Sequence, residues 1–158
     1  MNDSDDARDS DDARESVRHE HGLLDTNTVI LLNRITDPYT LPARPAISTI
    51  TLAELSVGPL VTDDPTERAA RQAHLQLAEA SFNALPFDAA AARKFGGVAA
   101  SLREVGRKPA ARAYDALIAS VALAQGLPLF TVNPSDFSGI AGLEVVAIPH
   151  PDTSKGTV

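Results

Sequence analysis

The chain has 158 residues, 44% of them apolar, and a formal net charge of −7. This length and composition suit one compact domain with a single core and leave no room for a second. The chain has no cysteine, which excludes disulfides and thiolate zinc sites and suits a reducing compartment. Its apolar stretches are too short to span a membrane, and its first residues are acidic, unlike a signal peptide. We therefore expect a soluble cytoplasmic protein.

The negative charge is concentrated at the N-terminus. Residues 1–21 hold eight acids against three arginines, a net −5, and the rest of the chain holds 13 acids against 11 bases, a net −2. Residues 3–8 read Asp-Ser-Asp-Asp-Ala-Arg, and residues 9–14 repeat them. Such a segment buries too little apolar surface to offset its ordering entropy. Residues 1–20 are predicted to be a disordered acidic extension; the alternative is an acidic decoy that mimics nucleic acid.

The first predicted strand ends at an acid. A short apolar run at residues 22–24 leads into Asp25, and apolar residues then recur at helical spacing at Val29 and Leu32. This pattern predicts a buried strand whose carboxyl end presents Asp25 at a helix start. In open α/β sheets that edge is where ligands bind. Two other interpretations stay open, with Asp25 as a simple helix cap or as part of a turn.

A second strand and helix carry Glu54. Residues 37–45 contain three prolines and are predicted to be loop, residues 46–49 form the second apolar strand, and its helix begins at Thr51. The run from Thr51 to Glu54 also matches a capping box, in which the Glu54 side chain bonds back to the backbone N–H of Thr51. Glu54 is therefore either a functional acid or part of a helix cap.

Three more helices are predicted further along the chain. Asp64 and Asp88 have the residue type and position of helix caps, and the helix after Asp88 runs from 89 to 105. A third helix runs from 114 to 125 and stops at Gly126, a common C-terminal signal.

Two short apolar runs are predicted to be strands, a core strand at 129–132 and an edge strand at 143–148. Because helices alternate with short apolar strands, the sequence predicts an α/β fold with three layers, in which helices cover both faces of a short, mostly parallel sheet. The folded domain is expected to span 21–150, followed by a C-terminal tail at 151–158.

Basic residues cluster in one stretch. Six of the 11 bases after residue 21 lie between residues 93 and 112, where Glu104 is the only acid. The cluster is either a solvated helix face or a surface that guides phosphate groups, since charge neutralisation supplies most non-specific affinity for nucleic acid. The bases predicted to contact phosphate are Arg107, Lys108 and Arg112. With seven aromatic residues in the chain, stacking on bases is not expected to be the main mode of binding.

Four acids stand beside the predicted strand ends or helix starts: Asp25, Glu54, Asp115 and Asp136. Phosphodiester hydrolysis needs an activated water and charge neutralisation at the phosphate, which divalent ions held by carboxylates provide. Magnesium and manganese prefer oxygen ligands, and Asn133 offers a further neutral oxygen. Without metal, such a cluster should repel itself and raise at least one pKa.

The stretches around these acids, in this order, resemble a PIN-domain nuclease, and within that group a VapC-type toxin of a bacterial or archaeal toxin–antitoxin pair. The resemblance covers residues 22–149 and implies a PIN-like fold and a Mg²⁺- or Mn²⁺-dependent endoribonuclease acting on RNA. It also implies a homodimer and a cognate antitoxin that blocks the site.

By this resemblance, Asp25, Glu54 and Asp115 match the first three acids of the family's metal-binding, catalytic quartet. Asp136 is expected to be the fourth, with support at the substrate from three polar residues: Thr26, Thr131 and Asn133. Val132 stands where the family has an arginine, which puts a phosphate contact from that position in doubt.

Three other functions compete with a nuclease. A haloacid-dehalogenase-like phosphatase would need an acid at position 27, which is Asn27, and a receiver-like domain would need a lysine at the end of the strand at 129–132. The stronger rival is a non-catalytic PIN-like module that binds RNA or a protein partner.

Overall fold

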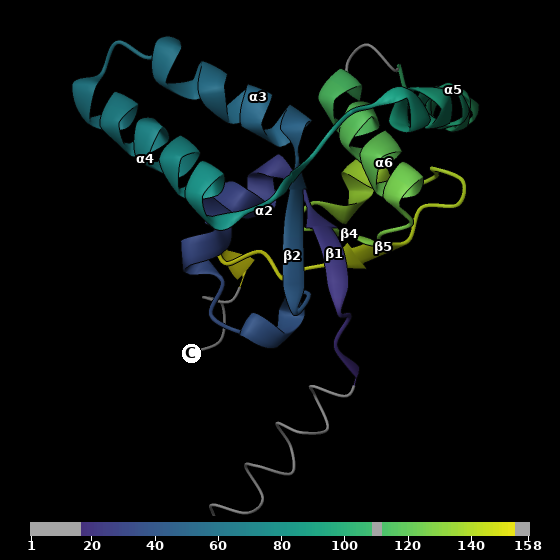
Figure 1. Ribbon diagram of the computed structural model, residues 1–158, viewed down its shortest axis with the longest axis horizontal. Helices are drawn as coiled ribbons and strands as arrows, with labels where there is room; N and C mark the ends of the chain where they lie inside the picture. The colour runs from purple at the N-terminus through teal and green to yellow at the C-terminus, as the bar shows by residue number, and fades with distance from the viewer. Residues whose placement is uncertain (1–16, 109–111, 154–158) are drawn as a thin grey trace, which may run out of the picture.

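A five-stranded sheet forms the centre of the molecule (Figure 1). The computed structural model describes residues 17–108 and 112–153. The strands are β1 (His21–Leu24), β2 (Arg44–Ser48), β3 (Ala84–Leu85), β4 (Leu129–Thr131) and β5 (Val145–Ala147). Their order is β3-β2-β1-β4-β5, with every neighbouring pair parallel. The carboxyl ends of β1, β2 and β4 therefore lie side by side, and β5 lies at an edge as predicted.

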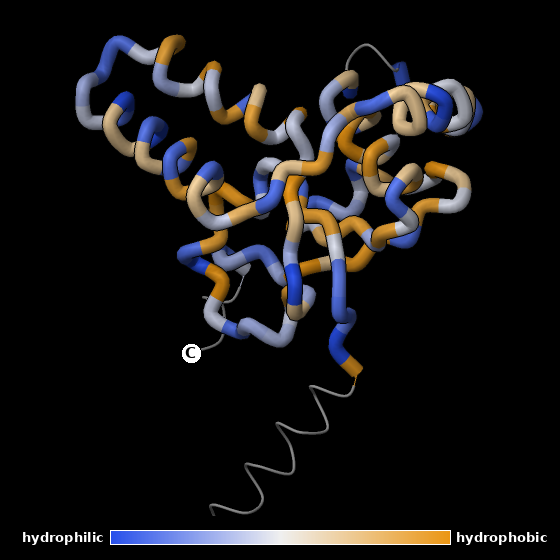
Figure 2. The backbone as a smooth tube through the Cα atoms, viewed as in Figure 1, coloured by the Kyte–Doolittle hydropathy of each residue, from blue (hydrophilic) through white to orange (hydrophobic). Residues whose placement is uncertain are grey.

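Helices cover both faces of the sheet. The helices α2 (Thr26–Leu31), α3 (Thr49–Val57) and α4 (Pro65–Ser81) lie on one side in Figure 1, and α5 (Ala89–Glu104) and α6 (Ala113–Gln125) lie on the other. Consecutive strand residues point to opposite faces, so Leu24 and Phe130 belong to one core and Leu23 and Leu129 to the other. Figure 2 shows hydrophobic colour where β1 and β2 pass between the helical layers. The predicted three-layer α/β fold is confirmed.

Several helix ends follow the predicted signals. The side chains of Asp64 and Asp88 accept backbone N–H groups in the first turns of α4 and α5. Helix α6 ends at Gly126 with φ 64°, in the left-handed region that glycine adopts without strain. Short 3-10 turns complete the described elements: η1 (Leu32–Arg34), η2 (Pro38–Thr40), η3 (Gly58–Leu60) and η5 (Pro134–Phe137).

Two predicted boundaries around β2 are wrong. The loop predicted at 37–45 contains the turn η2, and its last two residues already belong to β2. Pro45 is tolerated because it stands near the start of the strand. Helix α3 begins at Thr49, since Ser48 is its N-cap and accepts the backbone N–H of Thr51 at 3.2 Å.

The segment before β1 is part of the folded body. The Arg18 guanidinium donates to three backbone carbonyls in the loop at 38–42, at 2.7 to 3.2 Å. The His19 ring meets Phe130 edge-on with centroids 5.5 Å apart, and the Glu20 carbonyl accepts the N–H of Arg44 at 2.7 Å. The predicted extension boundary at residue 20 is therefore wrong, because these contacts belong to the fold. The prediction for residues 1–16 lies outside the described residues.

The C-terminal segment also contacts the body. Asp152, within the predicted tail, forms an ion pair with Arg34, while residues 154–158 lie outside the described part of the chain. No helix in the described ranges is long and apolar enough to cross a membrane.

Gly22 is required by close packing inside the sheet. A Cβ atom at this position would lie 2.5 Å from Cε2 of Phe130 and 3.0 Å from Cγ of Pro42. Phe130 fills the core beside β1, so the absent side chain at Gly22 lets β1 and β4 pair closely just before Asp25.

Candidate active site

The structure brings the four predicted acids to one edge of the sheet. Asp25 follows β1 directly and caps α2, and Asp136 lies in η5 directly after β4. Glu54 lies in α3, which begins where β2 ends, and Asp115 lies in the first turn of α6. Negative charge from Asp136 raises the pKa of both Asp25 and Asp115, and negative charge from Asp25 raises that of Glu54. Asp25, Asp115 and Asp136 are therefore within electrostatic reach of one another, and Glu54 is within reach of Asp25.

Two threonine hydroxyls hold the Asp25 carboxylate. The Thr28 hydroxyl and backbone N–H both donate to Oδ1, the latter at 3.1 Å, and the Thr131 hydroxyl donates to Oδ2 at 2.7 Å. Each hydroxyl in turn accepts a backbone N–H, that of Val132 at 3.2 Å and that of Asn133 at 2.9 Å. Because the accepted N–H fixes each oxygen, both hydroxyl protons point at Asp25. The side chain, only 3% exposed, is thus locked in one orientation.

Burial makes the acids reluctant to ionise. Desolvation raises the pKa of Asp25, against the opposing effect of its hydrogen bonds. Desolvation, followed by the charge of Asp136, raises the pKa of Asp115 to about 6, although Arg112 opposes this. Desolvation also raises the pKa of Glu54. A cation placed among these groups would stabilise their ionised forms.

Glu54 faces the site and is not a helix cap. Its Oε1 accepts the Thr26 hydroxyl at 2.7 Å, and that hydroxyl lies 3.1 Å from the hydroxyl of Thr51. The backbone N–H of Thr51 bonds to Ser48 instead. The capping-box interpretation of Glu54 is therefore wrong, because the helix begins earlier than the sequence suggests.

Arg112 bridges two of the acids. Its guanidinium forms an ion pair with Asp136 and lies 3.5 Å from Oδ2 of Asp115. The guanidinium is partly exposed and therefore lies at the mouth of the site. Among the described residues, Arg112 is the only cationic side chain paired to these acids.

Arg107 is used differently from Arg112. It donates to the backbone carbonyl of Asp136 at 3.0 Å and to the Ser138 hydroxyl at 2.9 Å. These bonds tie the segment after α5 to the turn that carries Asp136. Lys108 is exposed beside it.

The sequence model of the PIN domain matches residues 23–143. The chain belongs to the PIN-domain family. It is 37% identical over 129 residues to Ribonuclease VapC5 from Mycobacterium tuberculosis, which covers 80% of this chain and 93% of the relative. It is 28% identical over 133 residues to Ribonuclease VapC1 from Rickettsia felis, with 82% and 98% covered.

Solved structures of such PIN domains have the same fold. The VapBC-5 complex from Mycobacterium tuberculosis, a toxin–antitoxin system, contains a chain 34% identical to this one with a TM-score of 0.69, covering 82% of this chain and 99% of that one. VapBC2 from Rickettsia felis, bound to a DNA fragment from its promoter, gives 26% identity and a TM-score of 0.65, with 81% and 98% covered. The VapC-type resemblance predicted from the four motifs is confirmed.

The side chains of this PIN domain fit a hard divalent cation in chemistry. Every candidate donor is an oxygen, which is the preference of Mg²⁺ and Mn²⁺, and burial, with a smaller effect from neighbouring carboxylates, raises the pKa of Asp25 and of Asp115. Within the described ranges, no three His, Cys, Asp or Glu side chains already stand together as a metal-binding group. Arg112 occupies the place between Asp115 and Asp136 instead.

Two polar residues of this PIN domain were not expected from the sequence. Thr28 holds Asp25, and Thr51 lies within hydrogen-bonding distance of Thr26. Both are fully buried in helices, at positions where helical periodicity alone predicts apolar side chains. The sequence signal for these contacts is a threonine three residues from an acid: Thr28 follows Asp25 by three, and Thr51 precedes Glu54 by three.

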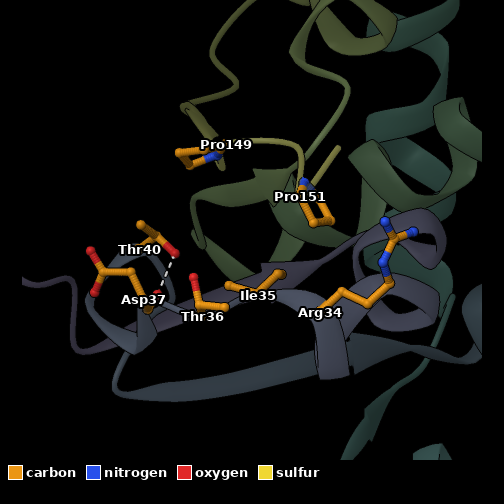
Figure 3. Close-up of a pocket in the computed structure, with 7 residues that line it drawn as sticks. All are labelled: Arg34, Ile35, Thr36, Asp37, Thr40, Pro149 and Pro151. Atoms are coloured by element: carbon orange, nitrogen blue, oxygen red, sulfur yellow. Dashed lines mark hydrogen bonds between the residues drawn. The ribbon is translucent and has the colours of Figure 1, made fainter. Parts of the chain in front are cut away.

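A separate cavity lies away from the acids. It has a volume of about 510 Å³ and is lined by residues of the loop after α2 and by Pro149 and Pro151 (Figure 3). None of the four acids lines it, so it is not part of the candidate active site of this PIN domain.

Proposed function

We propose that this chain is a Mg²⁺- or Mn²⁺-dependent endoribonuclease that acts as the toxin of a VapBC-type toxin–antitoxin pair. The observation that carries the proposal is the meeting of four acids from separate elements, Asp25, Glu54, Asp115 and Asp136, at one edge of a PIN-domain sheet. The similarity to proteins named Ribonuclease VapC supports RNA as the substrate.

The four acids are the proposed metal ligands and catalytic groups. When bound, the divalent ion supplies charge stabilisation at the phosphate and an activated water. Asp25, held by two hydroxyls, is the rigid ligand of the set, and Glu54 is oriented by Thr26. A ligand already fixed in one orientation loses little entropy when it binds, which favours tight positioning of the reacting groups.

The bases beside the site are proposed to hold the RNA backbone. Arg112 is the first candidate, because its guanidinium already lies among the acids and is free to turn to a phosphate when a metal ion neutralises them. Lys108 is exposed nearby and suits a phosphate contact without base preference. Arg107 is expected to contribute less, since its guanidinium already bonds to Asp136 and Ser138.

Thr131 and Asn133 are proposed to support the site from the end of β4. Thr131 orients Asp25, while Asn133, half-buried in the turn before Asp136, offers an amide oxygen or N–H to the substrate or to a water. This division assigns Asp136 as the fourth acid and Asn133 as a neutral helper.

The proposed partners are an antitoxin protein and a second copy of this chain. The antitoxin proposal rests on the similar solved complexes, which are toxin–antitoxin assemblies. Exposed apolar side chains are available for such contacts, with Leu60 84% and Val61 67% exposed at the turn between α3 and α4. Since the proposed substrate is cellular RNA, we place the protein in the cytoplasm.

The test is cleavage of single-stranded RNA by the purified chain. We expect cuts with Mg²⁺ or Mn²⁺, none with a chelator, and none with Asp25→Asn, because removing one carboxylate charge removes a metal ligand. Asp63→Asn, which changes an exposed acid far from β1 in sequence, is the matched control and should cleave normally. A wild type that binds RNA but does not cut it with either metal would favour the non-catalytic PIN-like module instead.

A further inference from the structure

We infer that the cavity between α2, α3 and α4 binds the nucleobase next to the cleaved phosphate, and that Asn27 and His74 recognise it. This inference rests on the proposed ribonuclease function and names the part of the substrate that the same site selects. The cavity has a volume of about 470 Å³, within the roughly 300 to 1,000 Å³ of pockets that hold small molecules.

The cavity is built from one face of each of three helices. Asn27 and Ile30 line it from α2, Glu54 lines it from α3, and Arg71 and His74 line it from α4. In Figure 1 the α3–α4 pair projects away from the sheet, and α2 lies beneath that pair. The spacing of the lining residues on each helix is helical, so these faces belong to rigid elements.

The cavity is continuous with the acid cluster. Two of its lining residues, Thr26 and Glu54, are joined by a hydrogen bond of 2.7 Å and belong to the candidate active site. A phosphate held at the acids therefore has a covalently attached nucleoside beside this opening.

The charges in the cavity favour a neutral group over a second phosphate. Arg71 is the one fixed cation among the lining residues, and its guanidinium is bonded to Glu67 and, at 2.9 Å, to the carbonyl of Gly58. Glu67 also accepts the Thr62 hydroxyl at 2.6 Å. Because this ion pair cancels, the remaining charge is that of Glu54, which would repel a phosphate.

The uncommitted polar groups suit the edge of a base. Within the described residues, neither the Asn27 amide nor the His74 ring has a hydrogen-bond partner in the protein, and the amide offers both donors and an acceptor. Ile30, 38% exposed, gives an apolar surface for the face of a base. RNA-binding proteins read unstacked bases through hydrogen bonds to their edges, and the lining has no Phe, Tyr or Trp, so His74 is its only aromatic ring.

The experiment is cleavage of a randomised single-stranded RNA by the wild type, Asn27→Ala and His74→Ala, with sequencing of the 5′ ends of the fragments. We expect the wild type to favour one base at one position beside the cut. Each variant should flatten that preference by about tenfold, the factor that corresponds to about 1.4 kcal/mol of base discrimination. Gln76→Ala, an exposed residue on the same helix α4, is the matched control and should keep the wild-type preference.

Two results would overturn the inference while leaving the ribonuclease proposal intact. One is a uniform loss of cleavage in both variants with an unchanged base preference, which would mean that the residues support the acids only. The other is an unchanged preference with weaker inhibition by the antitoxin, which would assign the cavity to the protein partner. A wild type that cuts no RNA at all would overturn both proposals together.

Discussion

Replacing Asp115 by asparagine is expected to stabilise the metal-free protein at neutral pH. Burial and the negative charge of Asp136 raise the pKa of Asp115 to about 6 from an ordinary value of 3.8. A shift of about two units corresponds to about 3 kcal/mol at 1.36 kcal/mol per unit. Since the side chain is 30% exposed, solvent screening reduces this, and we expect about 1 to 2 kcal/mol.

The sign follows from proton binding in the two states. The folded state binds the Asp115 proton more tightly than the unfolded state, so the free energy of unfolding falls as pH rises from about 4 to about 6 and stays low above that. Asparagine has no proton to lose. The stability difference between Asp115→Asn and the wild type should therefore be absent near pH 4 and complete above pH 6.

Calorimetric melting with a chelator, from about pH 4 to about pH 8, measures this difference. A gain of 1 to 2 kcal/mol corresponds to a rise of about 2 to 8 °C in melting temperature for a domain of this size. Asp63→Asn, at an exposed position, should shift it little at any pH. An Asp115→Asn variant that melts below the wild type at pH 7.5, or a difference that does not change with pH, would refute the electrostatic reasoning.

Three further substitutions test the structure around the site. Thr28→Val removes the hydroxyl that bonds to buried Asp25 and accepts the N–H of Val132; we expect a loss of about 1 to 3 kcal/mol in urea unfolding, largely restored in Thr28→Ser. Arg18→Ala removes three bonds to carbonyls of the loop at 38–42, so its melting temperature should fall by several degrees, whereas an unchanged value would detach this segment from the fold. Gly22→Ala places a Cβ atom 2.5 Å from Phe130 and should cost about 1 to 3 kcal/mol through overpacking, measured in the same way; a neutral effect would mean that the aromatic ring moves freely.

The sequence predicts the strands well, because their signal is local, while the role of the four acids as a site stays a prediction that rests on the family resemblance. The apolar run before Asp25 and the one before Asn133 are short enough to be strands and end in polar residues, and the structure places both as core strands. Parallel pairing then brings their carboxyl ends together without further information. The chain order of helices and strands was therefore sufficient to predict the edge at which the acids meet.

Thr26 and Thr131 were expected as supporting residues, but the carboxylates to which they bond could not be predicted, because these contacts join residues far apart in the chain. Thr131 bonds to Asp25 across 106 positions, and Thr26 bonds to Glu54 across 28. The local sequence pattern at Thr51 instead predicted a capping box with Glu54. In the structure β2 ends one residue earlier than predicted, so Ser48 is the N-cap of α3. The contacts of Arg18 likewise depend on backbone carbonyls of the loop at 38–42 that accept hydrogen bonds from its guanidinium. The composition of the sequence does not predict which backbone carbonyls are available in this way.

The roles of the basic residues between 93 and 112 also depend on tertiary structure. Arg107 and Arg112 have the same charge and lie close together in the sequence, yet one bonds to a backbone carbonyl and the other bridges two acids. Charge clustering predicted a basic surface near Asp115 and gave no means to divide structural from substrate-facing bases. The two arginines differ in role because η5 places the backbone carbonyl of Asp136 beside Arg107 and the Asp136 carboxylate beside Arg112.

Calorimetric titration with Mn²⁺ tests most directly the central claim that four acids from separate elements form one metal centre. We expect the wild type to bind Mn²⁺, and single variants that remove the charge of Asp25, Glu54, Asp115 or Asp136 to bind it about tenfold more weakly or worse, as the loss of a charged ligand requires. Asp63→Asn should bind like the wild type. A wild type that binds no Mn²⁺, or four variants with isotherms that match it, would contradict the metal centre.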